Sequence, residues 1–351
     1  MKIPLPRSRR SFLLALLSWS SLASGAAAPA KSAVVVTEVR KIWDQGQHNA
    51  FTDLVQWRGR WWCTFRESAG HVGGDGNIRV LESADGDKWT SAALIAEKDI
   101  DLRDPKFSIT PKDQLMINCG GSVYLGTSQL KGRRSRVMFS NDGRTWTPPA
   151  RVLGEGEWLW RVTWHQGIAY GAAYDHTAGR TGGTAAPEWW LKLYSSRDGL
   201  AWTLVTPLDV KGQPNETTLR FLPGGEMIAM VRREAGTTNG MIGRASPPYR
   251  RWTWQESNFR FGGPNFMRTP AGAWIASTRD YSESQPRSTK GRTTMIARME
   301  LNGPLTPIAT LPSGGDNSYA GMAWHEDRLW LSYYSSHEGK SAIYLAKIKM
   351  N

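Results

Sequence analysis

Short apolar runs of strand length, separated by turns rich in Gly, Pro and Asp, recur along the chain from about residue 33 onward. The first apolar residue after the central turn of each strand pair returns at near-regular intervals. These positions are Trp61, Leu115, Ala169, Met227, Trp274 and Leu329, with gaps of 54, 54, 58, 47 and 55 residues. Six units of roughly fifty residues, each able to hold four short strands, predict an all-β fold, a six-bladed β-propeller.

A second pattern, Ser-x-Asp-Gly-x-x-Trp, occurs three times, at residues 83–89, 140–146 and 196–202. In such an Asp-box the carboxylate accepts backbone N–H groups, the glycine takes a positive φ and the tryptophan packs at the base of the hairpin. The pattern therefore predicts a structural turn in three of the blades.

The two ends of the chain predict how the ring closes. Residues 33–39 form an apolar strand with no unit of its own, and the last unit (residues 319–324, 329–334 and 341–349) lacks a fourth strand. We expect the N-terminal strand to complete this last blade, since pairing the two edges seals the ring.

The first thirty residues have the pattern of an export signal. Arg9 and Arg10 precede an apolar stretch from Phe12 to about Ala23, and small residues follow at 26–30. This predicts a signal peptide of the twin-arginine type at residues 1–30, a propeller domain at 31–351, and a periplasmic or secreted protein. The apolar stretch is too short to span a bilayer, so we expect no stable membrane insertion.

The composition agrees with this assignment and restricts the partners. The chain has 36 Gly, 19 Pro and 18 Trp, as the turns and interfaces of a propeller require. Its net charge is +13, or +9 once the four cations of residues 1–30 are removed. A basic surface favours anionic ligands, although it also serves general solubility. No nucleic-acid motif is visible, so we expect acidic glycans as partners and no nucleic acid.

Cys63 and Cys119 fall in strands of neighbouring units, which favours two buried thiols over a disulfide. With no Cys/His cluster or His-Glu-x-x-His spacing, we expect no metal and no cofactor. Nothing in the sequence indicates the oligomeric state.

Innermost strands of a propeller begin at the central channel, so residues about ten before each periodic position should line a pocket. These are Asn49 or Ala50, Asp104, residues 158–161 with Arg161, Glu216, residues 264–265 and Tyr319. Residues five after each periodic position are Arg66, Gly120, Tyr174, Arg232, Arg279 and Tyr334. Arginine at three of these six positions indicates a shared polar pocket, because strands facing a core do not repeatedly bury an unpaired cation.

Two segments resemble the sialidase (neuraminidase) Asp-box superfamily. The first is residues 215–227, which end five residues before Arg232, and the second is residues 318–320, which are followed by Tyr333. The resemblance extends over residues 33–351. It implies an exo-acting, retaining glycoside hydrolase that removes a terminal acidic sugar, with sialylated or other acidic glycans as partners. In this reading Tyr319 is the nucleophile, Glu216 polarises it and Arg232 holds the substrate carboxylate.

The chemistry explains these residue types. A sialic acid carries a carboxylate on its anomeric carbon, which would repel an Asp or Glu nucleophile. A neutral phenol avoids that repulsion, but its ordinary pKa near 10 requires a close carboxylate to take the proton.

The resemblance also implies an acid/base in the loop after the second strand of the first unit. Asp75, flanked by glycines, matches by topology; the alternative is a plain Gly-Asp-Gly turn, and His71 is the reserve candidate. The family's third arginine corresponds to Arg292, with Arg287 as the nearby alternative.

The sequence departs from the family in two places. The family's first arginine is missing at residues 48–54, and Arg66 or Arg279 are the candidates to replace it. Asp104 stands where the family has Asn-Pro and is expected to hold an arginine or a sugar hydroxyl. With Arg161, these residues complete the predicted substrate-binding set.

Two other functions remain open. One is a non-catalytic glycan-binding propeller, because a fold does not define its function. The other is a carboxylate-pair glycosidase acting on neutral or uronic sugars through Asp53, Asp104, Asp75 or Glu216. Hydrogen-bond contact between Glu216 and Tyr319 would favour the sialidase-type hydrolase.

Overall fold

The computed structural model describes residues 34–72, 75–126, 129–176, 189–282 and 291–350, together with Met1. The predicted signal peptide at 1–30, apart from Met1, and the alternative arginine, Arg287, lie outside the described residues.

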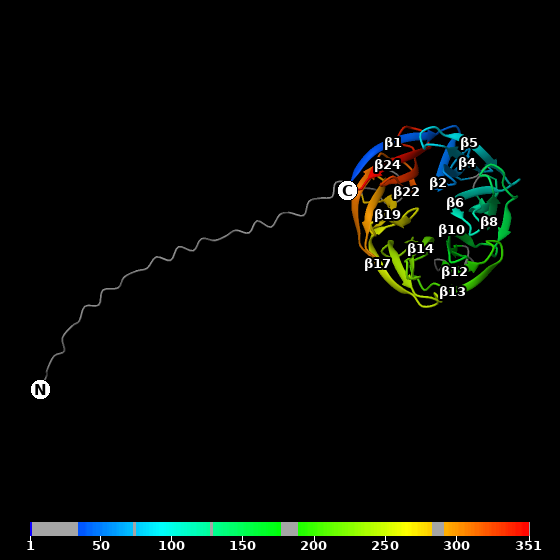
Figure 1. Ribbon diagram of the computed structural model, residues 1–351. Helices are drawn as coiled ribbons and strands as arrows, with labels where there is room; N and C mark the ends of the chain where they lie inside the picture. The colour runs from blue at the N-terminus through cyan, green and yellow to red at the C-terminus, as the bar shows by residue number, and fades with distance from the viewer. Residues whose placement is uncertain (2–33, 73–74, 127–128, 177–188, 283–290, 351) are drawn as a thin grey trace. The chain divides into compact units, whose positions relative to one another are not determined.

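The described residues form six four-stranded antiparallel sheets arranged as blades around a ring (Figure 1), a six-bladed β-propeller as predicted. Blade one contains β2 (His48–Trp57), β3 (Arg60–Ser68), β4 (Asn77–Ser83) and β5 (Thr90–Ile95). Blade two contains β6 (Asp101–Ile109), β7 (Leu115–Leu125), β8 (Gln129–Ser140) and β9 (Ala150–Val152). Blade three contains β10 (Trp158–His165), β11 (Ile168–Asp175), β12 (Trp190–Ser196) and β13 (Trp202–Pro207).

The second half of the ring repeats this order. Blade four contains β14 (Pro214–Phe221), β15 (Met227–Arg233), β16 (Asn239–Ala245) and β17 (Thr253–Arg260). Blade five contains β18 (Asn265–Arg268), β19 (Trp274–Asp280), β20 (Thr293–Met299) and β21 (Leu305–Leu311). Blade six contains β22 (Ser318–His325), β23 (Arg328–Ser335), β24 (Ala342–Lys349) and β1 (Val35–Trp43). The described part of the chain holds no helix long and apolar enough to cross a membrane.

The first strand closes the ring, which confirms the prediction. Strand β1 pairs antiparallel with β24 from Val35↔Lys349 to Trp43↔Ile343, so the blue and red ends of the chain share one sheet in Figure 1. Val36 and Val39 pack against the apolar cluster of blade six. Hydrogen bonds and the packing of half-buried side chains therefore both hold the N-terminal strand.

The three Ser-x-Asp-Gly-x-x-Trp segments form the same turn. In the second copy, Asp142 Oδ1 accepts the backbone N–H groups of Arg144 (2.8 Å) and Thr145 (2.7 Å). The indole of Trp146 donates to the carbonyl of Gly143 at 3.1 Å. Backbone hydrogen bonds lower the pKa of Asp142 to about 2, so the carboxylate is ionised at neutral pH.

Apolar side chains fill the space between neighbouring blades. One such cluster joins Trp62 and Ile78 of blade one to Leu102 and Leu115 of blade two. Cys63 and Cys119 are free and buried, which confirms the prediction of two buried thiols.

Five of the six innermost strands carry a register shift at the same height, near their first residues. The shifts lie between Ala50/Asp53, Arg103/Lys106, Leu159/Val162, Pro214/Thr217 and Ser318/Gly321. Phe51, Asp104 and Tyr319, inside three of these shifts, have positive φ angles of 64°, 52° and 56°. Bulges re-aim side chains, and strained backbone concentrates at functional sites, so this level of the ring is where a site is expected.

Candidate active site

Tyr319 and Glu216 meet across the ring from blades six and four. The Tyr319 hydroxyl donates to Glu216 Oε1 at 2.7 Å. Arg232 Nη1 donates to the same carboxylate oxygen at 2.8 Å and to the Tyr319 hydroxyl oxygen at 3.0 Å. Glu216 Oε2 accepts the backbone N–H of Gly263 at 2.8 Å. The expected contact between Glu216 and Tyr319 is therefore present, with an arginine bridging both.

The electrostatics of this group keep the phenol neutral. Burial, followed by the Glu216 carboxylate, raises the pKa of Tyr319 well above its ordinary value. Burial opposes the charge of Arg232, but Glu216 and neighbouring groups still hold the pKa of this arginine well above its usual value. The phenol can therefore become a nucleophile only if a base removes its proton, and Glu216 is the carboxylate within hydrogen-bond reach.

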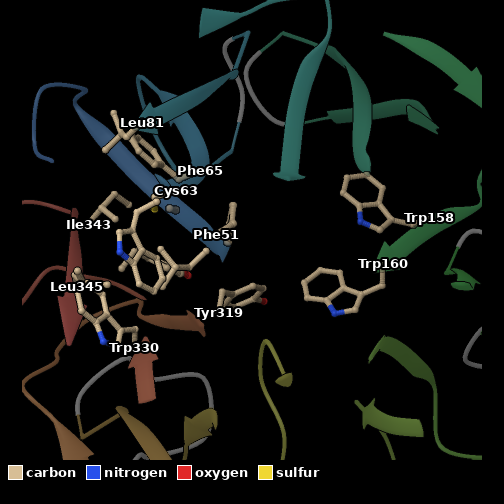
Figure 2. Close-up of a cluster of buried hydrophobic side chains, with 14 residues drawn as sticks. Phe51, Cys63, Phe65, Leu81, Trp158, Trp160, Tyr319, Trp330, Ile343 and Leu345 are labelled. Atoms are coloured by element: carbon tan, nitrogen blue, oxygen red, sulfur yellow. The ribbon is translucent and has the colours of Figure 1, made fainter. Parts of the chain in front are cut away.

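The backbone around Tyr319 has room for this ring because residue 263 is a glycine. A Cβ at Gly263 would lie 2.5 Å from Cγ of Tyr319, and Gly263 has a φ of 61°. Figure 2 shows the Tyr319 ring between Phe51 and Trp160, whose ring centroids lie 5.1 and 5.7 Å from it. Aromatic packing and a close backbone thus position the phenol.

Lys106 is a buried cation beside the same ring. Its Nζ donates to the Thr52 carbonyl at 3.0 Å and lies 5.8 Å from the centroid of Tyr319. Burial, with a contribution from Arg161, lowers the pKa of Lys106 to about 8. No sequence pattern had singled out this lysine.

A cavity of about 240 Å³ opens in front of Tyr319 and Glu216. Its other polar lining groups include His71, Asp104, Arg103 and Arg133. The walls are completed by Phe51, Ser122, Tyr124, Leu130, Trp158, Tyr174 and His176. This mixture of aromatic walls with a few convergent polar groups is typical of a small-ligand site.

His71, on the cavity wall, is held by a carboxylate behind it. His71 Nδ1 lies 3.1 Å from Asp316 Oδ2, which also accepts the hydroxyl of Tyr334 at 2.7 Å. Burial disfavours the Asp316 carboxylate, but Arg279 and His71 hold its pKa well below the usual range. Asp316 is thus an anion that orients the His71 ring.

Asp104 differs from Asp316 in its surroundings. Burial raises the pKa of Asp104, although Arg103 and Lys106 oppose the shift. Its Oδ1 is buried and has no hydrogen-bond partner among the described residues. A carboxyl group with a raised pKa and a spare oxygen can donate a proton or bind a sugar hydroxyl.

Asp75, the predicted acid/base, is exposed in the structure and is not among the residues that line the cavity. The reserve candidate, His71, lies on the cavity wall instead.

Two predicted arginines, Arg279 and Arg292, gather with Arg260 around one tyrosine, Tyr281. The guanidinium carbons of Arg260, Arg292 and Arg279 lie 4.5, 5.2 and 5.8 Å from the ring centroid of Tyr281. Arg279 also lies 5.3 Å from the centroid of Tyr319. The structure thus brings Arg279 close to Tyr319, which Arg232 contacts directly, and it places Arg292 beside Tyr281. Sequence reasoning missed Tyr281, although it follows Arg279 by two residues.

These arginines differ in how fully they are paired. Arg279 Nη2 donates to Asp316 Oδ1 at 2.7 Å, and Arg232 Nη2 lies 2.5 Å from Glu234 Oε1. The Nε atoms of Arg232, Arg260 and Arg292 are all buried without a hydrogen-bond partner among the described residues. Arg232 and Arg260 are paired with Glu234, whereas Arg292 forms no ion pair with a described residue. Arg292 is therefore the member of the cluster best able to accept an added anion.

The structure places Arg66 and Arg161 elsewhere, although both were predicted to bind substrate. Arg66 is fully buried, with its Nε 2.7 Å from Asp101 Oδ1, and donates to the Gly70 carbonyl at 2.7 Å. It thereby supports the loop that carries His71. Arg161 forms a buried ion pair with Asp53 at 2.7 Å. Neither arginine is among the residues that line the cavity, because each is already paired with a buried carboxylate.

His48, His71 and Asp316 each place one potential metal-ligand atom within 4.8 Å of the others. Burial and then the charges of His71 and Arg66 lower the pKa of His48 to about 4, and Arg279 pairs with Asp316. Because Arg279 already neutralises the one carboxylate, this group is better described as an ion-pair network than as a cation site.

Comparisons with known proteins support the fold. No family model and no curated protein sequence matches the chain. A solved protein of unknown function from Dyadobacter fermentans is similar over 91% of this chain and 99% of its own, with 18% identity and a TM-score of 0.75. Trypanosoma rangeli sialidase, in complex with the inhibitor DANA, matches 90% of this chain and 58% of its own length, with 11% identity and a TM-score of 0.66. An alpha-L-arabinanase from Penicillium chrysogenum, complexed with arabinobiose, matches 89% of this chain and 98% of its own, with 13% identity and a TM-score of 0.65. At these identities the likeness defines the class of fold, the six-bladed propeller.

Proposed function

We propose that the protein is an exo-acting, retaining glycoside hydrolase of the sialidase type, which removes a terminal acidic sugar from glycans. The observation that carries this proposal is the 2.7 Å hydrogen bond from the Tyr319 hydroxyl to Glu216, bridged by Arg232. Two of the fold's neighbours, a sialidase and an arabinanase, act on sugars, which supports a carbohydrate substrate.

The reaction proceeds in two displacements. As Glu216 takes the phenolic proton, the Tyr319 oxygen attacks the anomeric carbon and the bond to the leaving oxygen breaks. An acid gives its proton to that leaving oxygen. In the second step the same group, now a base, takes a proton from water, which attacks the anomeric carbon and releases Tyr319. Glu216 then returns the proton to the phenolate.

His71 is the acid/base in this proposal. It lines the cavity with Tyr319, whereas Asp75 does not, and Asp316 fixes its ring through Nδ1. Its other ring nitrogen is then the one available for proton exchange with the leaving oxygen.

The arginine cluster around Tyr281 is the proposed site for the sugar carboxylate. Arg292, with its unpartnered Nε, provides the open donor, and Arg232 and Arg279 add positive charge near Tyr319. Guanidinium groups suit this role because they bind a carboxylate with defined orientation.

The Tyr319→Phe variant tests the nucleophile. We expect it to fold normally and to lose turnover of an aryl sialoside, because no oxygen remains to form the glycosyl adduct. Tyr333→Phe is the matched control, since it removes a buried phenol that donates to the Pro312 carbonyl outside the cavity. Full activity of Tyr319→Phe would exclude this mechanism.

A second candidate function is a carboxylate-pair glycosidase acting on another sugar. Asp104 and Glu216 line the same cavity, and burial gives Asp104 the raised pKa that a general acid needs. This function predicts that Asp104→Asn abolishes turnover while Tyr319→Phe retains most of it. A panel of aryl sialosides, uronides and arabinosides would identify the sugar, and no product from any of them would favour the non-catalytic glycan-binding alternative.

The proposal includes export by residues 1–30 to the periplasm or the exterior. Secretion from a host with a twin-arginine pathway, followed by N-terminal sequencing, should give a mature protein that starts near Pro29 or Lys31.

A further inference from the structure

A second and larger hollow lies beside the cavity, between blades three and four. We call it the groove; its volume is about 530 Å³, within the range of ligand sites. Its walls include Trp189, Trp190, Pro207, Leu208, Val210 and Pro214. Trp190 is 54% exposed, so a large aromatic surface faces solvent here.

The groove opens on the same end of the blades as the cavity. In the sheet of blade three, Trp190 of the groove is the strand partner of Asp175. Tyr174, the residue before Asp175, is the strand partner of Trp158 in the cavity wall. In blade four, Pro214 lines the groove and Glu216, two residues later, lines the cavity. The two hollows are therefore neighbours at one level of the ring.

A row of aromatic rings connects them. His176 lines the cavity, and its ring centroid lies 5.4 Å from that of Trp189, which lines the groove. On its other side, the centroid of His176 lies 6.5 Å from that of Tyr174. Arg133 packs over both Tyr174 and Trp158, at 5.1 and 5.2 Å. Aromatic rings thus continue from the cavity wall into the groove.

The charged groups of the groove are paired with neighbouring groups of opposite sign. Lys192 Nζ lies 3.0 Å from Glu157, and Lys211 Nζ lies 3.1 Å from Asp209. The cavity, in contrast, contains Arg133, whose Nη2 is buried without a hydrogen-bond partner among the described residues. The groove therefore suits a neutral ligand, and the cavity an anionic one.

We propose that the groove binds neutral sugar residues of the glycan chain from which the terminal acidic sugar is cleaved. The axial C–H groups of such sugars pack well on the electron-rich faces of aromatic rings, and the row of rings gives the chain a path out of the cavity. This inference rests on the proposed function, and it makes an oligosaccharide the preferred substrate over a simple sialoside.

The test uses the full-length Tyr319→Phe protein and isothermal titration with free sialic acid, sialyllactose and sialyl-lacto-N-tetraose. We expect affinity to rise with the number of neutral sugars, by about tenfold from the shortest to the longest probe. Adding Trp189→Ala should reduce the affinity for the longest probe to that for the shortest. The control is Trp252→Ala, which removes a tryptophan at the opposite end of blade four whose indole donates to the Tyr249 carbonyl.

The outcomes separate this inference from the proposed function. If affinity does not depend on chain length, or if the gain with length persists in Trp189→Ala, the groove does not bind the neutral sugars and the inference is wrong. Hydrolysis of a sialoside by the unmodified protein would still support the proposed enzyme. If no sialoside binds, the neutral lacto-N-tetraose decides the matter. If lacto-N-tetraose binds and Trp189→Ala abolishes this binding, the groove is a sugar-binding site although the sialidase proposal fails. If lacto-N-tetraose does not bind, the inference about the groove is wrong. A dimer in sedimentation that Trp189→Ala dissociates would assign the groove to a second copy and overturn the inference.

Discussion

At the scale of single residues, the site depends on which carboxylates are already paired. Asp53 and Asp101 are buried beside arginines and serve the fold, whereas Glu216 contacts both Arg232 and a tyrosine hydroxyl. The same residue type therefore has different chemistry according to its neighbours.

Glu216→Gln should reduce kcat on an aryl sialoside by about 10²–10⁴-fold, because the amide cannot accept the phenolic proton. The control is Glu226→Gln, which alters an ion pair with Arg244 (2.7 Å) at the opposite end of blade four. Steady-state kinetics and thermal melts of both variants provide the measurement. Equal kcat values for the two variants would remove Glu216 from the mechanism.

Lys106 gives the protein a specific pH dependence. Burial lowers its pKa to about 8 in the folded state, below the ordinary value near 10.4 in the unfolded chain. Between these values the unfolded chain binds more protons, so this lysine makes the free energy of unfolding rise with pH.

We expect Lys106→Met to lack this contribution. Urea unfolding of both proteins at about pH 7 and about pH 9.5 should show a larger gain in stability with pH for the unmodified chain. Other titrating groups are common to both proteins, so parallel pH profiles would contradict the lowered pKa.

At the scale of elements, the Ser-x-Asp-Gly-x-x-Trp turns join neighbouring blades as well as strands. A Cβ at Gly86 would lie 2.1 Å from the Trp330 ring of blade six, and one at Gly143 would lie 2.2 Å from the Trp62 ring of blade one. The glycine in these two turns thus permits both the positive φ and the contact with the blade before it.

Gly143→Ala should cost about 2–4 kcal/mol, the sum of left-handed strain and a clash with Trp62. Gly59→Ala is the matched control, because Gly59 has a φ of 70° and nothing within 4 Å of an added Cβ. It should cost only about 1 kcal/mol. Chemical denaturation measures both, and equal losses would show that the contact between blades contributes little.

At the scale of the whole molecule, closure depends on β1, which supplies the outer strand of blade six. Without it, β24 presents an unpaired edge, and the apolar cluster beneath β1 loses its cover. Unpaired sheet edges recruit other chains.

Deletion of residues 33–39 should therefore make the protein insoluble or aggregated in size-exclusion chromatography. Deletion of residues 1–30 alone is the control and should give a monodisperse folded protein. A soluble, active protein without residues 33–39 would reject this account of closure.

The repeating apolar pattern, the Asp-Gly turns and the spare N-terminal strand were sufficient to predict the ring, its six blades and its closure. Blades and turns depend on local geometry, because strand periodicity and turn conformation are encoded by residues close together in the chain. Closure joins distant residues, and it was predictable because one unit lacked a strand and one strand lacked a unit. The register also placed Glu216, Arg232 and Tyr319 around one pocket, since equivalent positions of a regular ring lie at the same height. The resemblance to the sialidase superfamily implied that Glu216 and Tyr319 meet there.

Only the tertiary structure decided which of the remaining polar residues reach the cavity. Arg66 and Arg161 form ion pairs with Asp101 and Asp53. His71 rather than Asp75 lines the cavity. No sequence pattern had indicated Tyr281, Lys106 or Trp189. Loop conformation and charge pairing depend on residues distant in the chain, so local patterns cannot determine them.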